Sequence, residues 1–93
     1  MTKKILTLHP EGKKGVNIDL AKYNLIKETI LELTRLKGEI LYQEMNKMAI
    51  KKLKNKFSGS IPWYVVTVKL DLEARGILER IPNASPHKLR IRA

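Results

Sequence analysis

The fold is decided by the stretch LDLEARGILER, residues 70–80, in which a helical pattern gives way to a strand pattern. The helical pattern begins at about Ile61 and extends to Arg75, and Gly76 is expected to end the helix. The residues that follow, 77–81, are β-prone. One face of this helix is assigned to the core by its apolar spacing, and it consists of Ile61, Val65, Val68 and Leu72.

The segments on both sides of this stretch extend the pattern. Residues 88–92 are a second β-prone run, and residues 82–87 join it to the first run as a hairpin with a flexible tip. Before the helix, residues 58–60 break the preceding structure. Ser60 followed by Ile61 and Pro62 is typical of a helix start, because proline is tolerated in the first turn. We therefore expect a helix followed by a β-hairpin.

Two further helices are expected upstream. Asp19 is a plausible N-cap of the first, and Gly38 should end it. After Gly38, Glu39 and Ile40 can supply one β-bridge, and a second helix extends to about Lys54. Residues 3–8 are β-prone and are expected to form a short strand or arm, followed by a loop. The apolar stripes are Tyr23, Ile26, Ile30 and Leu33 for the first helix and Leu41, Met45, Met48 and Leu53 for the second.

This order of elements, and the pattern of residues 70–80 in particular, resembles the winged helix-turn-helix superfamily of transcription regulators. In that superfamily, the end of the recognition helix and the first wing strand carry a leucine, mostly polar residues, a glycine, two aliphatic residues, an acid and an arginine. The resemblance covers about residues 23–92 and implies a mainly α fold, with a three-helix core and a small antiparallel β-wing. The sequence departs from the pattern where helix 2 opens with Leu41 or Tyr42 instead of serine or threonine, and in a longer, more basic connection between helices 2 and 3.

Length and composition limit the possible classes of protein. A chain of 93 residues supports one core, so we expect a single domain over residues 19–93 preceded by an arm and basic loop over residues 1–18. The chain has no cysteine, no apolar run long enough to cross a bilayer and no signal peptide, which favours a cytoplasmic protein without membrane contact. His9 and His87 have no partners at metal spacing, the loop at residues 12–15 lacks the pattern of a phosphate-binding P-loop, and no carboxylate pair accompanies a nucleophile. We expect no metal, no cofactor and no enzymatic activity.

The net charge of +10 indicates attraction to polyanions. Residues 45–60 hold five lysines and no acid, and residues 80–93 hold four cations and no acid. The lysine run fits either a solvated helix face or a phosphate-contacting one. In the wing, Leu89 and Ile91 should point inward and the alternating cations outward.

The face of the third helix opposite its core face carries none of the side chains that usually read bases in the major groove. Trp63 and Leu70 there fit a second buried stripe, packed under the N-terminal arm or at a dimer contact. Alternatively, Trp63, Tyr64 and Thr67 touch bases or sugars.

The sequence thus predicts a nucleic-acid-binding winged-helix protein, a transcription regulator that holds double-stranded DNA mainly through phosphates, with a homodimer as an option. The rival hypothesis is a protein-interaction module that docks through its third helix, and RNA binding is a third. The candidate nucleic-acid contacts are Lys47, Lys51, Lys52, Lys54, Lys56, Ser60, Trp63, Tyr64, Thr67, Arg80, His87, Lys88, Arg90 and Arg92.

Overall fold

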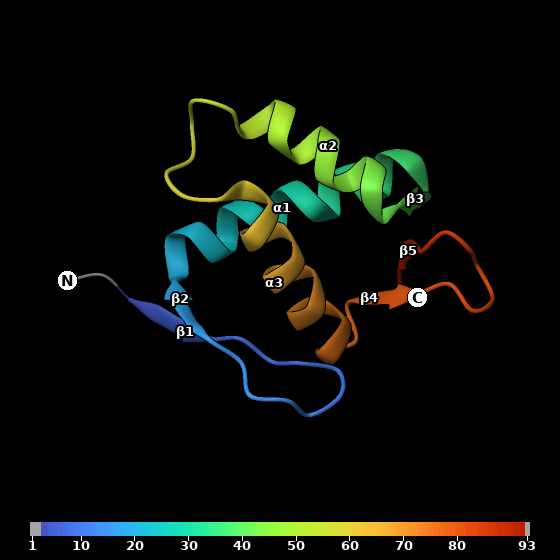
Figure 1. Cartoon of the computed structure of the whole chain (residues 1–93), viewed down its shortest axis with the longest axis horizontal. Helices are drawn as coiled ribbons and strands as arrows, with labels where there is room; N and C mark the ends of the chain where they lie inside the picture. Colours follow the sequence, from blue (N-terminus) through green and yellow to red (C-terminus); the bar gives the residue numbers. More distant parts are fainter. Residues whose placement is uncertain (1–2, 93) are drawn as a thin grey trace.

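The computed structural model describes residues 3–92, which form three α-helices and two small antiparallel sheets (Figure 1). The two sheets lie at opposite ends of the molecule, with the helices between them. The mixed α/β architecture agrees with the expected helices and hairpin. In chain order the elements are β1 (Lys4–Leu6), β2 (Asn17–Asp19), α1 (Leu20–Lys37), β3 (Glu39–Leu41), α2 (Tyr42–Leu53), α3 (Ile61–Ala74), β4 (Leu78–Arg80) and β5 (Lys88–Ile91).

Helix α1 begins and ends at the residues that the sequence indicates. Asp19 is the N-cap, and its Oδ2 accepts a hydrogen bond of 3.0 Å from the Lys22 N–H. Gly38 follows the last turn with a φ of 76°, a backbone conformation that glycine adopts without steric cost. All four residues of the expected apolar stripe are buried.

The start of α2 differs slightly from the expectation. The apolar spacing predicts Leu41 on the apolar face of the second helix, but Leu41 ends β3, with its Cα opposite Lys88 of β5, and α2 begins at Tyr42. Pairing with β5 holds Leu41 in the extended conformation, with φ −65° and ψ 137°. The rest of the stripe is correct, since Met45 and Leu53 are buried and Met48 packs against the core.

Helix α3 also follows the prediction closely. Ser60 is its N-cap and accepts a 3.3 Å hydrogen bond from the Trp63 N–H, and Pro62 lies in the first turn. Val65, Val68 and Leu72 have no exposed surface. The helix ends with Arg75 as its C-cap, directly before Gly76.

The β-hairpin belongs to a three-stranded sheet in the order β3-β5-β4. Strand β5 pairs with both neighbours in antiparallel fashion, so the expected bridge at Glu39 and Ile40 becomes a full edge strand. Ile40, Leu78 and Leu89 point from the three strands into the core and are at most 1% exposed. The sheet is thereby anchored to the helices by one buried side chain per strand.

The N-terminal segment is more structured than a strand followed by a loop. Strand β1 pairs with β2, with Ile5 opposite Ile18, and the buried Thr7 extends the pairing. The Thr7 N–H and hydroxyl both donate to the Val16 carbonyl, and the Val16 N–H donates to the Thr7 hydroxyl. Local composition could not reveal a partner nine residues away across a glycine-containing loop. We call residues 3–19 the N-terminal hairpin.

One hydrophobic core unites the elements. It lies between α1, α2 and α3 and extends into both sheets through Ile18 at one end and Leu78 and Leu89 at the other. Since the N-terminal hairpin contributes Ile18 to this core, it packs as part of the same body as the helices.

Candidate nucleic-acid interface

The outward face of α2 carries the largest group of free cations. Lys47 and Lys51 lie on the side of the helix opposite the buried Met45 and Ala49, Lys54 follows directly as the C-cap, and all three lysines are exposed. Lys56 follows in the exposed connection to α3. Within residues 3–92, none of these four ammonium groups lies within ion-pair distance of a carboxylate; the pairs formed are those of Lys13, Lys37, Lys52, Lys69, Arg75 and Arg90.

Lys52, the fifth lysine of the run, is placed differently from the others. Its Nζ lies 2.5 Å from Oε2 of Glu32 on α1, with both side chains substantially exposed. An exposed pair of this kind contributes little to stability. It does lower the positive charge that Lys52 adds to the surface, because the carboxylate compensates it locally.

The hairpin β4–β5 presents fewer free cations than the alternation of apolar and basic residues in its sequence predicts. Leu89 is fully buried as expected, and Arg80 and Arg92 are exposed. Arg90, however, is only partly exposed, and its Nε donates to Oε2 of Glu79 on the neighbouring strand at 2.5 Å. Lys88 is half-buried. The free cations of this hairpin are therefore mainly Arg80 and Arg92.

His87 joins the hairpin to α2. Its ring stacks on Tyr42 with the centroids 5.6 Å apart, and its carbonyl accepts a hydrogen bond from the Tyr42 N–H. Its Nε2 is buried without a hydrogen-bond partner in the described residues. Burial lowers the pKa of His87, and the positive charges of Lys69 and Arg80 lower it further. Both effects favour the neutral form of the imidazole, whose Nε2 is turned away from solvent.

The candidate residues at the start of α3 have separate surroundings. Ser60 is exposed and caps the helix through its hydroxyl. Tyr64 is half-buried, and its ring meets Phe57 edge-on, with the ammonium of Lys22 5.5 Å from both ring centroids. Trp63 exposes 44% of its surface, and Thr67 is half-buried.

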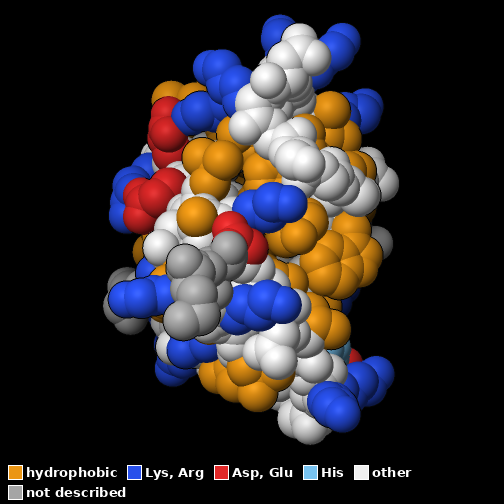
Figure 2. Space-filling model, turned by 90° about the vertical axis from the view of Figure 1, so that its left-hand side faces the viewer, with side chains coloured by type: hydrophobic (Ala, Val, Ile, Leu, Met, Phe, Trp, Pro, Cys, Tyr) orange, Lys and Arg blue, Asp and Glu red, His pale blue; other side chains and the backbone are white. Residues whose placement is uncertain are grey.

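The outer face of α3 meets the N-terminal hairpin at a concavity of about 160 Å³. Trp63, Thr67 and Leu70 line it from the helix. Neither Trp63 nor Leu70 is fully buried, so the expected second stripe under the arm is only partly covered. Figure 2 shows the end of the molecule that carries the N-terminal hairpin, where hydrophobic side chains gather between lysines and arginines. The hairpin lines the concavity with Thr7, Leu8, His9, Lys14, Gly15 and Val16.

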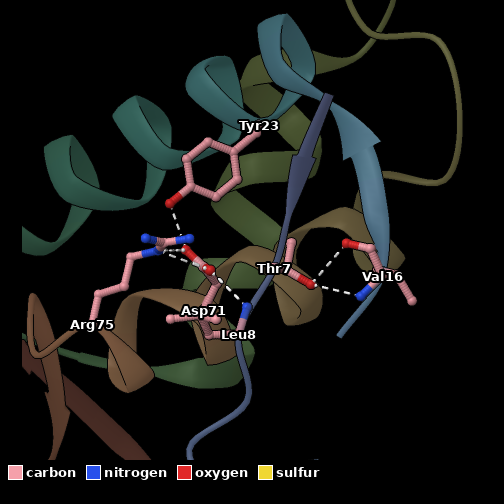
Figure 3. A network of polar contacts seen from close by, with 6 residues as sticks. All are labelled: Thr7, Leu8, Val16, Tyr23, Asp71 and Arg75. Carbon is pink, nitrogen blue, oxygen red and sulfur yellow. Dashed lines mark hydrogen bonds and ion pairs between the residues drawn. The ribbon is translucent and has the colours of Figure 1, made fainter. Parts of the chain in front are cut away.

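A buried carboxylate holds the hairpin against the helices (Figure 3). Asp71 of α3 is fully buried. Its oxygens accept hydrogen bonds from the Tyr23 hydroxyl on α1, from Nε of Arg75 and from the Leu8 N–H. Burial and the neighbouring Asp71 carboxylate raise the pKa of Tyr23 to about 12, so this hydroxyl remains a donor at neutral pH.

A second, largely buried ion pair lies within α3, beside Tyr42 of α2. Nζ of Lys69 is 3.0 Å from Oε2 of Glu73 one turn later, and it lies 5.4 Å from the ring centroid of Tyr42. The sequence shows the i, i+4 spacing of this pair, but such spacing is common on solvated helices. Only the position of Tyr42 in the fold reveals that Lys69 is buried.

No three histidine, cysteine, aspartate or glutamate side chains within residues 3–92 lie close enough together to hold a metal ion. No helix in this part of the chain is long and apolar enough to span a bilayer.

These features define a small mixed α/β domain with three helices and a sheet at each end. The chain belongs to a family of unknown function, DUF6958, whose model matches residues 4–89. The match spans the N-terminal hairpin as well as the helices and extends into β5. A search of curated proteins found no match, and a search of solved structures found none either.

Proposed function

We propose that this domain binds nucleic acid, with duplex DNA as the first candidate, and that it holds the phosphate backbone by charge. The observation that carries the proposal is the set of exposed, unpaired lysines on the outward face of α2. Cations without a carboxylate partner retain their charge for an external anion, and their contact with phosphates releases counterions. The set consists of Lys47 and Lys51 on the helix, Lys54 at its C-cap and Lys56 in the connection that follows.

We also propose that the domain docks as a winged helix does. The order of α1, β3, α2, α3 and the β4–β5 hairpin, with β3 completing the sheet, supports this arrangement. In Figure 1 α3 lies below α2 and leads into the hairpin. Arg80 and Arg92 on the hairpin would contact one part of the backbone and the α2 lysines another.

The outer face of α3 favours binding without strong sequence preference. It is mainly apolar, and the N-terminal hairpin partly covers it at Thr67 and Leu70. Asp71, on the same helix, is buried and paired with Arg75. Without a free arginine, lysine, asparagine or glutamine on this face, direct base readout lacks its usual donors and acceptors.

Charge-removing variants of equal size test the proposal. Replacing Lys47, Lys51 and Lys54 by glutamine should weaken binding to unrelated duplexes by a similar factor, measured by fluorescence anisotropy at about 50 mM salt. The control replaces Lys13, Lys27 and Arg35, three cations outside α2 and the β4–β5 hairpin, and changes the net charge by the same amount. Equal loss in both variants would mean that net charge acts alone and that no interface exists on α2.

Protein docking through α3 is the second candidate, because Trp63 exposes 44% of its surface beside the concavity. Aromatic side chains half-exposed on a mainly apolar face are frequent anchors of protein interfaces. The two candidate functions are distinguished by how substitutions affect duplex binding. Trp63→Ala should leave duplex binding nearly unchanged if the lysines of α2 carry it.

A further inference from the structure

We infer that the concavity between α3 and the N-terminal hairpin is a binding site for a small aromatic carboxylate of about one ring. Its wall is apolar on both sides, with Leu70 and Trp63 from the helix and Leu8 and Val16 from the hairpin. The site is separate from the lysines of α2, so it does not depend on the proposed nucleic-acid binding.

The size of the concavity sets the size of the ligand. Its volume is about 160 Å³, and an apolar cavity of about 150 Å³ holds one benzene ring. The indole of Trp63, 44% exposed, offers an aromatic surface at this site. An offset or edge-on contact with a second ring adds to the gain from removing apolar area from water.

The charges around the concavity select an anion. No aspartate or glutamate is among the residues that line it, whereas Lys14 is one of them. The nearby Asp71 is fully buried and engaged with Arg75, so its charge is compensated within the protein. Lys14 is exposed and forms no ion pair in the described part of the chain, which leaves its ammonium available to a carboxylate at the rim.

The polar groups of the wall differ in availability. The Thr7 hydroxyl both donates to and accepts from the Val16 backbone, so it is not available to a ligand. The Thr67 hydroxyl, in contrast, forms no hydrogen bond with a described residue outside its own helix, so no such bond competes with a ligand. It can therefore donate to a ligand oxygen. One ammonium at the rim and one hydroxyl in the wall match the two oxygens of a carboxylate.

The walls are held in place before any ligand binds. A Cβ on Gly15 would lie 1.7 Å from the Thr7 carbonyl oxygen. Only glycine at this position therefore allows the two chain segments to approach so closely. The Leu8 N–H is fixed to the Asp71 carboxylate at 2.9 Å. A preformed site loses less conformational entropy on binding than one that must order its walls.

Titration of the full chain with benzoate tests the inference, with ¹H–¹⁵N NMR spectra as the readout. We expect saturable shifts of the Trp63 indole N–H and of the Leu8 and Gly15 amides, with a dissociation constant of about 0.1–10 mM for so small a ligand. Lys14→Gln should weaken benzoate binding about threefold, the size of one exposed ion pair. It should leave the binding of the uncharged benzyl alcohol unchanged.

The matched control is Lys13→Gln, which removes the adjacent lysine that does not line the concavity and pairs with Glu11 instead. It should leave benzoate binding unchanged. The inference is overturned if benzoate gives no saturation at these amides up to about 50 mM, a concentration at which a ligand of this size should saturate. It is also overturned if acetate produces the same shifts, or if Lys13→Gln and Lys14→Gln act equally. Shifts at the same amides that depend on protein concentration alone would identify a second copy of the chain as the occupant.

Discussion

The backbone N–H of Leu8 donates a hydrogen bond of 2.9 Å to Oδ1 of Asp71, a residue 63 positions further along the chain. The same buried carboxylate accepts from Tyr23 on α1 and from Arg75 on its own helix. One side chain therefore joins the N-terminal hairpin, α1 and α3 (Figure 3). The position of the hairpin over the outer face of α3 depends on it.

Replacing Asp71 by alanine should lower the free energy of unfolding by about 2–4 kcal/mol, because the buried Tyr23 hydroxyl, the Leu8 N–H and Nε of Arg75 all lose a charged acceptor. Urea unfolding followed by circular dichroism measures the change. Tyr23→Phe removes one donor and leaves the pairs with Arg75 and Leu8, so it should cost only about 1–2 kcal/mol. An Asp71→Ala loss below about 1 kcal/mol would mean that the network contributes little.

Leu72→Ala should cost about 2–5 kcal/mol, since Leu72 has no exposed surface and its truncation leaves a cavity in a packed core. The same urea experiment measures it. Leu36 is the natural control, because 73% of its surface is exposed at the end of α1. Leu36→Ala should change stability by less than about 0.5 kcal/mol. Similar costs for the two leucines would contradict the assignment of the core face.

Gly15→Ala should displace the N-terminal hairpin, because its Cβ would lie 1.7 Å from the backbone oxygen of Thr7. We expect a loss of stability and faster hydrogen exchange at the Thr7 and Val16 amides. Gly12→Asn serves as the comparison, since no atom lies within 4 Å of a Cβ there and asparagine tolerates its φ of +74°. Unchanged exchange at Thr7 in Gly15→Ala would show that the loop can yield without opening the pairing.

The hairpin β4–β5 should make stability depend on pH through His87. Its pKa is lowered in the folded protein, chiefly by burial and then by Lys69 and Arg80. As the pH falls from about 6.5, the usual histidine value, towards the folded pKa, the unfolded chain binds the proton first. The free energy of unfolding should therefore fall over this window and be fully retained above it.

Urea midpoints at pH 7, 6 and 5 measure this effect against two variants. His87→Phe keeps a ring against Tyr42 and should show a smaller loss towards acid than the unsubstituted protein. His9→Gln, which removes the other histidine of the chain, should keep the full loss. An NMR titration of the His87 ring with a midpoint above 6.5 would reverse the sign of the prediction.

The helices and the hairpin could be predicted because each is specified by local chemistry. Asp19, Gly38 and Ser60 mark helix ends whose cap geometry depends on a few neighbouring residues. The buried face of α3 follows from apolar spacing alone. The β1–β2 pairing could not be found in this way, because it joins Ile5 to Ile18 across a loop whose composition is typical of a solvated turn.

The sequence alone predicts the positive charge of the candidate site, but not which of its cations form ion pairs. Sequence identifies the lysines of α2 and their outward face. It does not show that Glu32 of α1 reaches Lys52 or that Glu79 reaches Arg90, because these contacts depend on how separate elements pack. The buried state of Asp71 was missed for the same reason, since its donors come from residues 8 and 23. Gly15 and Lys14 acquire a possible role only once the hairpin lies against α3.

The most direct measurement of the central claim is the affinity of the unsubstituted protein for an arbitrary DNA duplex as a function of salt concentration. The exposed cations on α2, beyond its end and on the β4–β5 hairpin that form no ion pair within residues 3–92 are Lys47, Lys51, Lys54, Lys56, Arg80 and Arg92. With about four to six of them on phosphates, the logarithm of the affinity should fall against the logarithm of salt concentration with a slope of roughly −4 to −5, similarly for unrelated sequences. The absence of any duplex binding at about 50 mM salt and micromolar protein would contradict the claim and favour docking to a protein through α3.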